Sequence, residues 1–199
     1  MSKADMEHWQ HITRDLVKLK NTSEMMMDLA YSAVLLNSNY LAEEVQLLEE
    51  QMDQLHIDFQ CRALSRTEEE VDPRDLLGII RMGNVTERIA DAAAEIAEVV
   101  LRGIEPHPIL QMVIQDAEET VERVTVSADS PLVGKTLKEA AIADETGMWV
   151  LVIRRDNKWI RPRPDTVLMA EDVVIASGYS EGEEDFKRLL TGKNSEEKE

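Results

Sequence analysis

Residues 5 to 102 contain almost no glycine or proline, and this feature limits the first half of the chain to long helices. Apolar side chains recur there at spacings of three and four residues, as at Leu16, Leu19, Met26 and Ala30. This repeat is typical of amphipathic helices that bury one face. The first half is therefore expected to be helical throughout.

Two breaks divide this stretch into three helices. The motif NSN ends the first helix, and EEEVDPRD separates a second helix, about 40 to 66, from a third, about 73 to 102. Asp72 followed by Pro73 predicts an N-cap with proline at the first helical position, and Gly103 predicts a C-terminal stop. Three long helices joined by short connections favour an up-down-up bundle.

The pattern changes after Gly103. GIEPHP interrupts the helices, and ILQMVIQDAEE predicts a short connecting helix. ERVTVSA alternates like a strand, MWVLVIRRDNKWIRP predicts two strands around a turn at Asp156 and Asn157, and DVVIASG predicts a final strand. Capping boxes at Thr136/Glu139 and Ser180/Glu183 predict two helices. The order β-α-β-β-β-α predicts a mainly antiparallel α+β unit.

The expected fold class is therefore a two-domain chain, an α-helical domain followed by an α+β domain. The expected boundaries are a helical bundle over 1–105, a connecting helix or linker over 106–120, an α+β domain over 121–191 and a disordered polar tail over 192–199.

The charge of the chain limits its partners. The net charge is -18, and the first 121 residues hold 10 basic against 24 acidic side chains. Such a surface repels phosphate backbones, so we expect no nucleic-acid partner. A lone cysteine, Cys61, leaves no intramolecular disulfide, which suits the cytoplasm. Neither a secretory signal nor an apolar run of about 20 residues is present, so no direct membrane span is expected.

The residues do not favour an enzyme. Gly134-Lys135-Thr136 matches the end of a phosphate-binding loop, but Asp129 stands where that loop needs its first glycine. The chain also lacks a dinucleotide-binding glycine motif. Neither His56 nor His107 has a second histidine at metal-ligand spacing, and His8 and His11 lie near a terminus that is expected to fray. We therefore expect no catalytic residues.

A glutamate followed four residues later by an aspartate occurs once in each predicted helix of the first half, the first such pair being Glu24 with Asp28. Glu49 with Asp53, and Glu87 with Asp91, place both carboxylates on one helix face, where they can share a hard cation. The alternative is a solvated acidic face, since the chain is rich in carboxylates throughout.

The segments VTERIADAAAEIAEVV, YLAEEVQLLEEQMDQLHIDF and SEMMMDLAYSAV resemble the helices of PhoU-like domains, over about residues 10 to 103. The resemblance implies a three-helix bundle and a role in regulating transport. Some members of that family bind metal through acidic helix pairs. This implies metal ligands at Glu87 and Asp91, and at Glu49 and Asp53.

The second half, from Val124 to Leu190, resembles the TrkA-C domain, also called the C-terminal domain of regulators of potassium conductance. The resemblance lies in SPLVGKTL, in a strand ending Ile-x-Arg, in a Pro-containing segment and in Glu171-Asp172 before VVIASG. It implies a dimerising module that senses a small ligand for potassium channels and transporters. Some members bind cyclic di-AMP.

The ligand site implied by this resemblance is the basic hairpin. We expect Arg154, Asn157, Ile160 and Pro164 to contact an anion, with a two-fold axis doubling each contribution. The alternative is an exposed edge whose charges prevent strand-to-strand aggregation.

Together these observations predict a non-enzymatic, cytoplasmic accessory subunit of potassium or other cation transport, acting as a homodimer with a membrane-embedded channel or transporter. Its effector would be a cyclic dinucleotide or another small anion. The alternative is a metal-binding regulator of phosphate or divalent-cation transport, in which the second domain serves only for dimerisation.

Overall fold

The computed structural model describes residues 3–65, 72–103 and 119–192. The chain divides into two compact units, residues 1–103 and 104–199. The connecting helix expected over 106–120 and the tail expected over 192–199 fall almost entirely outside the described residues. None of the described helices combines the length and the apolar character that a membrane span requires.

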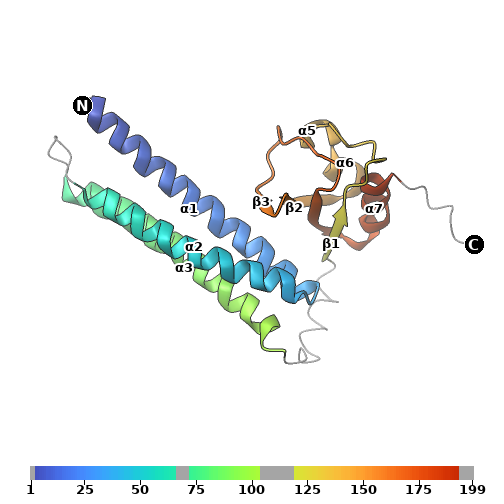
Figure 1. Ribbon diagram of the computed structural model, residues 1–199, viewed down its shortest axis with the longest axis horizontal. Coiled ribbons are helices and arrows are strands. Elements are labelled where there is room, and N and C mark those ends of the chain that lie inside the picture. The colour runs from blue at the N-terminus through green and yellow to red at the C-terminus, as the bar shows by residue number, and fades with distance from the viewer. Residues whose placement is uncertain (1–2, 66–71, 104–118, 193–199) are drawn as a thin grey trace, which may run out of the picture. The chain divides into compact units, whose positions relative to one another are not determined.

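The first unit is the predicted three-helix bundle. Its helices are α1 (Lys3–Leu35), α2 (Asn39–Leu64) and α3 (Pro73–Leu101), which lie side by side along much of their length (Figure 1). Each pair of helices is in contact, so the apolar faces meet in one core. The largest fully buried side chains of this core are Phe59, Leu19, Met26, Leu29, Leu41 and Met52.

The predicted helix boundaries are confirmed. The Ser38 hydroxyl accepts a hydrogen bond from the backbone N–H of Leu41 at 3.4 Å, and Asn37 before it has φ of 45°. The Asp72 carboxylate accepts from the N–H of Arg74 at 2.8 Å. Gly103 follows the last turn of α3 with φ of 61°, a conformation that glycine adopts without strain.

The close contact between α2 and α3 depends on a glycine, Gly83 of α3, which has no side chain. A Cβ atom added at Gly83 of α3 would overlap the ring of Phe59 on α2. Glycine therefore admits the largest buried side chain of the bundle at this crossing.

The second unit is a four-stranded antiparallel sheet in the order β1-β4-β2-β3. Its strands are β1 (Glu119–Thr125), β2 (Met148–Arg155), β3 (Lys158–Ile160) and β4 (Val173–Tyr179). β1 pairs with β4 over its whole length, and β2 pairs with β4 with a register shift between Val150 and Val152. The predicted mainly antiparallel sheet is confirmed.

The hairpin between β2 and β3 turns at the two residues expected from the sequence. Asp156 and Asn157 have φ of 48° and 61°, and Arg155 pairs with Lys158 across the turn. Two successive positive φ values define the turn type that matches strand twist in two-residue hairpins. The predicted hairpin is confirmed.

The helices of this unit are α5 (Leu137–Ala140), α6 (Ile142–Thr146) and α7 (Glu183–Thr191), with a 3₁₀ turn over Ser180–Gly182. The capping box of Thr136 and Glu139 is confirmed, with both reciprocal bonds present. Ala141, at φ of 45°, divides the single predicted helix into α5 and α6.

The second predicted capping box, Ser180 with Glu183, is wrong. The 3₁₀ turn occupies Ser180, so α7 begins after Gly182 and has no side-chain cap. Three acidic side chains in the first turn of α7 favour its positive N-terminal end instead.

Helices and sheet enclose one core. Its most buried members come from β2, β4, α7 and the loops, with Ile160 of β3 packed at its margin. They are Val126, Leu132, Met148, Ile153, Leu168, Val174, Ala176, Phe186 and Leu190.

Candidate ligand and metal sites

An acidic cluster lies between α2 and α3 and contains three of the four predicted metal-ligand residues. Glu49 and Asp53 of α2 and Asp91 of α3 each offer a carboxylate oxygen within 4.8 Å of the others. Glu87 lies one turn before Asp91 and close enough for the charges of Asp53 and Asp91 to act on it. The structure thus brings together acidic pairs that are nearly forty residues apart in the sequence.

Burial and mutual repulsion act on this cluster. The pKa of Glu49 is raised, first by its partial burial and then by the charges of Asp53 and Asp91. The pKa of Glu87 is also raised by burial and by Asp91, with an opposing effect from His56. The cluster therefore favours either a proton or a cation.

Further polar side chains extend the contact between α2 and α3. His56, Gln60 and Asn84 form a closed triangle of hydrogen bonds, with the Asn84 side-chain oxygen 3.0 Å from His56 Nε2 and 2.9 Å from Gln60 Nε2. Gln46 donates to the carbonyl of Ala94 at 2.9 Å. Sequence reasoning missed these residues, although His56 and Gln60 share the spacing of the acidic pairs.

The cluster has dimensions suited to a hard divalent cation. Oxygens bound to one Ca²⁺ at about 2.4 Å lie at most about 4.8 Å apart, which matches the upper limit here. By contrast, Glu24 of the pair on α1 forms an ion pair with Lys20 at 2.7 Å, on the exposed surface. The acidic pair of α1 is not part of the cluster.

The four residues predicted to bind an anion do not share one pocket. Arg154 lies on β2 with its guanidinium 5.6 Å from the centre of the Trp159 ring, the residue paired with it on β3. Asn157 is exposed at the turn, and Ile160 packs against the core. Pro164 lines a separate pocket.

This pocket, of about 420 Å³, lies between α5, α6, β2 and the segment after β3. Its charged lining consists of Lys138, Arg163 and Asp144, and Trp149, with 55% of its surface exposed, is its aromatic wall. The other lining residues are Leu137, Ala141, Ile142, Ala143, Val150, Pro162 and Pro164. Two cations beside an indole and two prolines suit a ligand with an anionic group and a flat ring.

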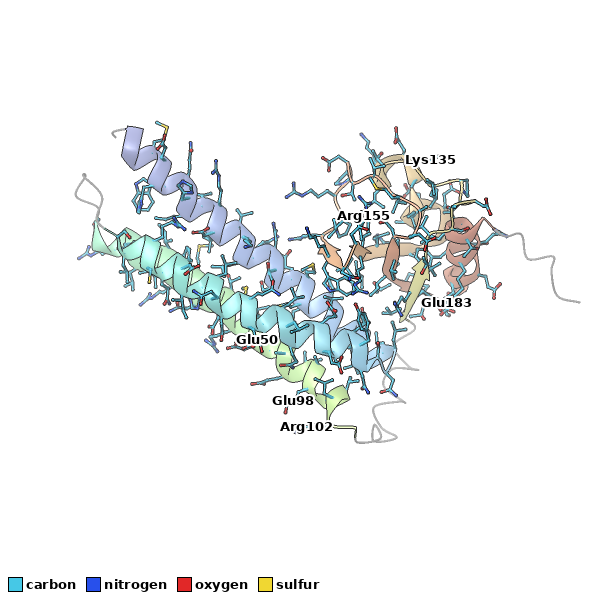
Figure 2. The ribbon with its side chains drawn as sticks, in the orientation of Figure 1. Glu50, Glu98, Arg102, Lys135, Arg155 and Glu183 are labelled. Carbon is cyan, nitrogen blue, oxygen red and sulfur yellow. The ribbon has the colours of Figure 1, made fainter. Side chains whose placement is uncertain are left out.

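Arg155, next to Arg154, has a different role. Its guanidinium donates two hydrogen bonds of 2.7 Å to the carboxylate of Asp172, which is fully buried, and a third of 2.7 Å to the carbonyl of Val167. The Asp172 carboxylate also accepts from the N–H of Met169 at 2.9 Å. The hydrogen bonds to Asp172 raise the pKa of Arg155, and the whole set ties the hairpin to the loop before β4. Figure 2 labels Arg155 in the second unit.

Sequence reasoning named Arg155 and Asp172 as motif positions without recognising their pairing. The available signal was an aspartate directly before an apolar strand, since such a carboxylate needs a cationic partner if the fold buries it.

The fold and these sites define a two-domain protein in which a helical bundle with an acidic cluster precedes a small α+β domain with a cationic pocket. Residues 16–100 match the PhoU domain and residues 121–191 match the TrkA-C domain. The chain therefore contains a PhoU domain followed by a TrkA-C domain, in the order that the sequence predicted.

Two similar proteins come from Methanocaldococcus jannaschii. Potassium channel protein 1 is 31% identical over 99 residues, which cover 49% of this chain and 29% of that protein. Probable potassium channel protein 2 is 35% identical over 79 residues, which cover 38% of this chain and 23% of that protein. The chain thus spans less than a third of the length of either relative.

Matches among solved structures include RCK_C domains. The RCK_C domain dimer of S. agalactiae BusR in complex with c-di-AMP has a TM-score of 0.34 and 25% identity, covering 35% of this chain and 93% of that one. The RCK C domain of the potassium transport protein KtrA, also with c-di-AMP, has a TM-score of 0.34 and 18% identity, covering 41% and 94%. BusR with its promoter DNA has a TM-score of 0.33 and 15% identity, covering 83% and 96%.

Proposed function

We propose that this chain is a non-enzymatic, cytoplasmic regulatory subunit of cation transport, with potassium as the transported ion. It acts as a homodimer through its TrkA-C domain and associates with a membrane channel or transporter in trans. The TrkA-C and PhoU domains and the likeness to potassium channel proteins support this function. Nucleic acid is not among the proposed partners, because a net charge of -18 opposes phosphate backbones.

The observation that carries the proposal is the pocket beside Pro164. Lys138 and Arg163 provide two positive charges, and Trp149 offers an exposed ring. This combination fits an effector that has a phosphate group and a nucleobase. A cyclic dinucleotide carries two of each. Arg154 and Asn157 lie outside the lining of this pocket and stay a separate candidate for anion contact on the hairpin.

Isothermal titration of the full-length protein with cyclic di-AMP tests ligand sensing, with ATP and inorganic phosphate as comparison probes. Replacing both Lys138 and Arg163 by alanine should weaken binding by roughly a hundredfold, since each lost charge-assisted contact costs about 1.4 kcal/mol. Lys158→Ala is the matched control, because this exposed cation lies on the same hairpin but outside the pocket lining.

Two results would contradict ligand sensing at this pocket. Absence of heat with all three probes would leave the TrkA-C domain without the proposed effector. Equal losses in the double variant and in Lys158→Ala would show attraction by overall charge alone. Arg154→Ala separately tests the hairpin, with the dimer mass followed by light scattering so that binding and assembly are distinguished.

A second candidate function is favoured by the acidic cluster. We propose that Glu49, Asp53, Asp91 and Glu87 hold a divalent cation, which makes the PhoU domain a metal-dependent part of the regulator. Burial and then repulsion between carboxylates raise the pKa of Glu49 and Glu87, and a bound cation would relieve that repulsion.

Metal analysis of protein purified without chelator tests this site. Glu49→Gln combined with Asp91→Asn should abolish binding of Ca²⁺ or Mn²⁺, because half of the carboxylates are lost. Glu43→Gln, on the same helix but outside the cluster, should leave it unchanged. Equal metal content in the wild type and the double variant would remove the metal function without affecting the proposal for the TrkA-C pocket.

A further inference from the structure

Helix α3 carries apolar residues on a face that no other part of the described chain covers. These residues follow one another at spacings of 3, 4, 3, 4 and 3, and we call them the outer stripe: Met82, Val85, Ile89, Ala92, Ile96 and Val99. Met82 is 60% exposed, Val85 55% and Val99 50%. A regular stripe of this kind is costly to leave in water.

The outer stripe is not part of the bundle core. The core face of α3 is formed by small residues, among them the buried Ala90, Ala93 and Ala97. The face toward α2 carries Asp91 and the carbonyl of Ala94 that accepts from Gln46. With 100° between successive residues, the stripe falls on the remaining side of the helix.

We propose that the outer stripe is an interface for α3 of a second copy of this chain, packed antiparallel. Alternating spacings of three and four are the pattern by which two helices interlock side chains along a seam. In the antiparallel arrangement, Met82 lies opposite Val99 of the second copy, Val85 opposite Ile96, and Ile89 opposite Ala92. The same three layers repeat beyond the two-fold axis, so the stripe is complementary to itself.

Charges beside the stripe select the antiparallel direction. Arg88 and Glu95 are both exposed and flank the same edge of the stripe, seven residues apart. Antiparallel packing places Arg88 opposite Glu95 of the second copy, and the two-fold axis forms this pair twice. Parallel packing would place Arg88 opposite Ala93, and Glu95 opposite Val100, with no opposite charges facing.

The ends of the stripe are compatible with this arrangement. Arg81 falls opposite Arg102 of the second copy, but Arg102 already forms an ion pair with Glu98 at 3.0 Å. Figure 2 shows Glu98 and Arg102 at the end of α3. The stripe is about 26 Å long, from a rise of 1.5 Å per residue. This interface is independent of the TrkA-C domain and of any ligand.

Cross-linking of the full-length chain tests the interface. In a Cys61→Ser background, Ala92→Cys places thiols of the two copies about 4.5 Å apart along the helix axis, whereas Glu98→Cys separates them by about 22 Å. A short bismaleimide should therefore join Ala92→Cys chains roughly tenfold more efficiently than Glu98→Cys chains. Equal yields at the two positions, or none at Ala92→Cys, would overturn the proposal.

Charge reversal in the Ala92→Cys background tests the direction. Arg88→Glu alone and Glu95→Arg alone should each lower the cross-linking yield roughly fivefold, because two attractive pairs become repulsive. The double reversal should restore the yield, which loss of folding would not do. Circular dichroism verifies helix content in each variant. Unchanged yields in both single reversals, or a double reversal without recovery, would overturn the antiparallel pairing.

Discussion

At the scale of single residues, the pairing of Arg155 with Asp172 is the clearest structural determinant of the TrkA-C domain. The carboxylate is fully buried and accepts three hydrogen bonds, two of them from Arg155. A buried charge without its partner is strongly unfavourable, so the two positions depend on each other.

Asp172→Asn should therefore destabilise the protein by about 3 kcal/mol, because an amide replaces one accepting oxygen and leaves the guanidinium without its counter-charge. Urea unfolding followed by fluorescence reports mainly this domain, because it holds Trp149 and Trp159, two of the three tryptophans, whereas Trp9 lies in α1. Asp165→Asn, an exposed change in the preceding loop, should alter the free energy by less than about 0.5 kcal/mol. Similar losses in both variants would contradict the assigned role.

Partial burial, together with repulsion by Asp53 and Asp91, makes the contribution of Glu49 to stability depend on pH. Its pKa in the folded protein is raised above the ordinary value of 4.5, so its ionised form disfavours folding at neutral pH, and this penalty disappears as the pH falls through the folded pKa to 4.5. In metal-free protein, Glu49→Gln should stabilise the bundle near neutral pH by on the order of 0.5 kcal/mol.

The gain from Glu49→Gln should vanish at a pH below 4.5, where the wild-type side chain is also neutral. Thermal unfolding over a pH series measures it, with Glu43→Gln as the variant outside the cluster. A difference that is independent of pH would point to altered packing rather than charge.

The sequence predicted the residues of the acidic cluster better than it predicted the contact partners of the two arginines on β2. The acidic pairs were found because a spacing of four fixes a shared helix face. The roles of Arg154 and Arg155 were harder to separate, because the register shift between Val150 and Val152 interrupts the alternation of the strand. The sequence does not reveal this shift, so alternation alone does not tell which arginine points toward Asp172.

At the scale of elements, most of the architecture followed from local rules. The three helices, the hairpin turn at Asp156 and Asn157, and the cap at Thr136 were predicted correctly from spacing and turn chemistry. The start of α7 was not, because tertiary packing beside Gly182 placed a 3₁₀ turn where a capping box was expected. A Cβ at Gly182 would overlap the carbonyl of Thr146, a contact that no local pattern reveals.

Two glycines of α3 provide a matched pair for helix packing. Gly78→Ala should stabilise the protein by about 0.5 to 1 kcal/mol, because nothing lies within 4 Å of the added methyl group and alanine favours helix. Gly83→Ala should instead destabilise it by about 1 to 2 kcal/mol, because the methyl group meets the buried ring of Phe59. Urea unfolding measures both, and a stabilising Gly83→Ala would contradict the close crossing of α2 and α3.

At the scale of the whole molecule, the net charge of -18 should make stability depend on salt. Screening reduces self-repulsion, so raising NaCl to about 0.5 M, where the Debye length is roughly 4 Å, should raise the unfolding temperature. Tetramethylammonium chloride at equal ionic strength separates this effect from specific binding of Na⁺. A melting temperature that falls with both salts would show that ion pairs outweigh repulsion.

The placement of β1 in the sheet has a mechanical consequence. This strand begins at Glu119 and pairs with β4 through seven successive residues, up to Thr125 with Val173. Its ladder bonds lie across the strand direction, so a pull along the strand loads all of them together, whereas a sideways pull opens them one after another. The β1–β4 ladder can therefore transmit tension along the chain, and it is weakest against peeling.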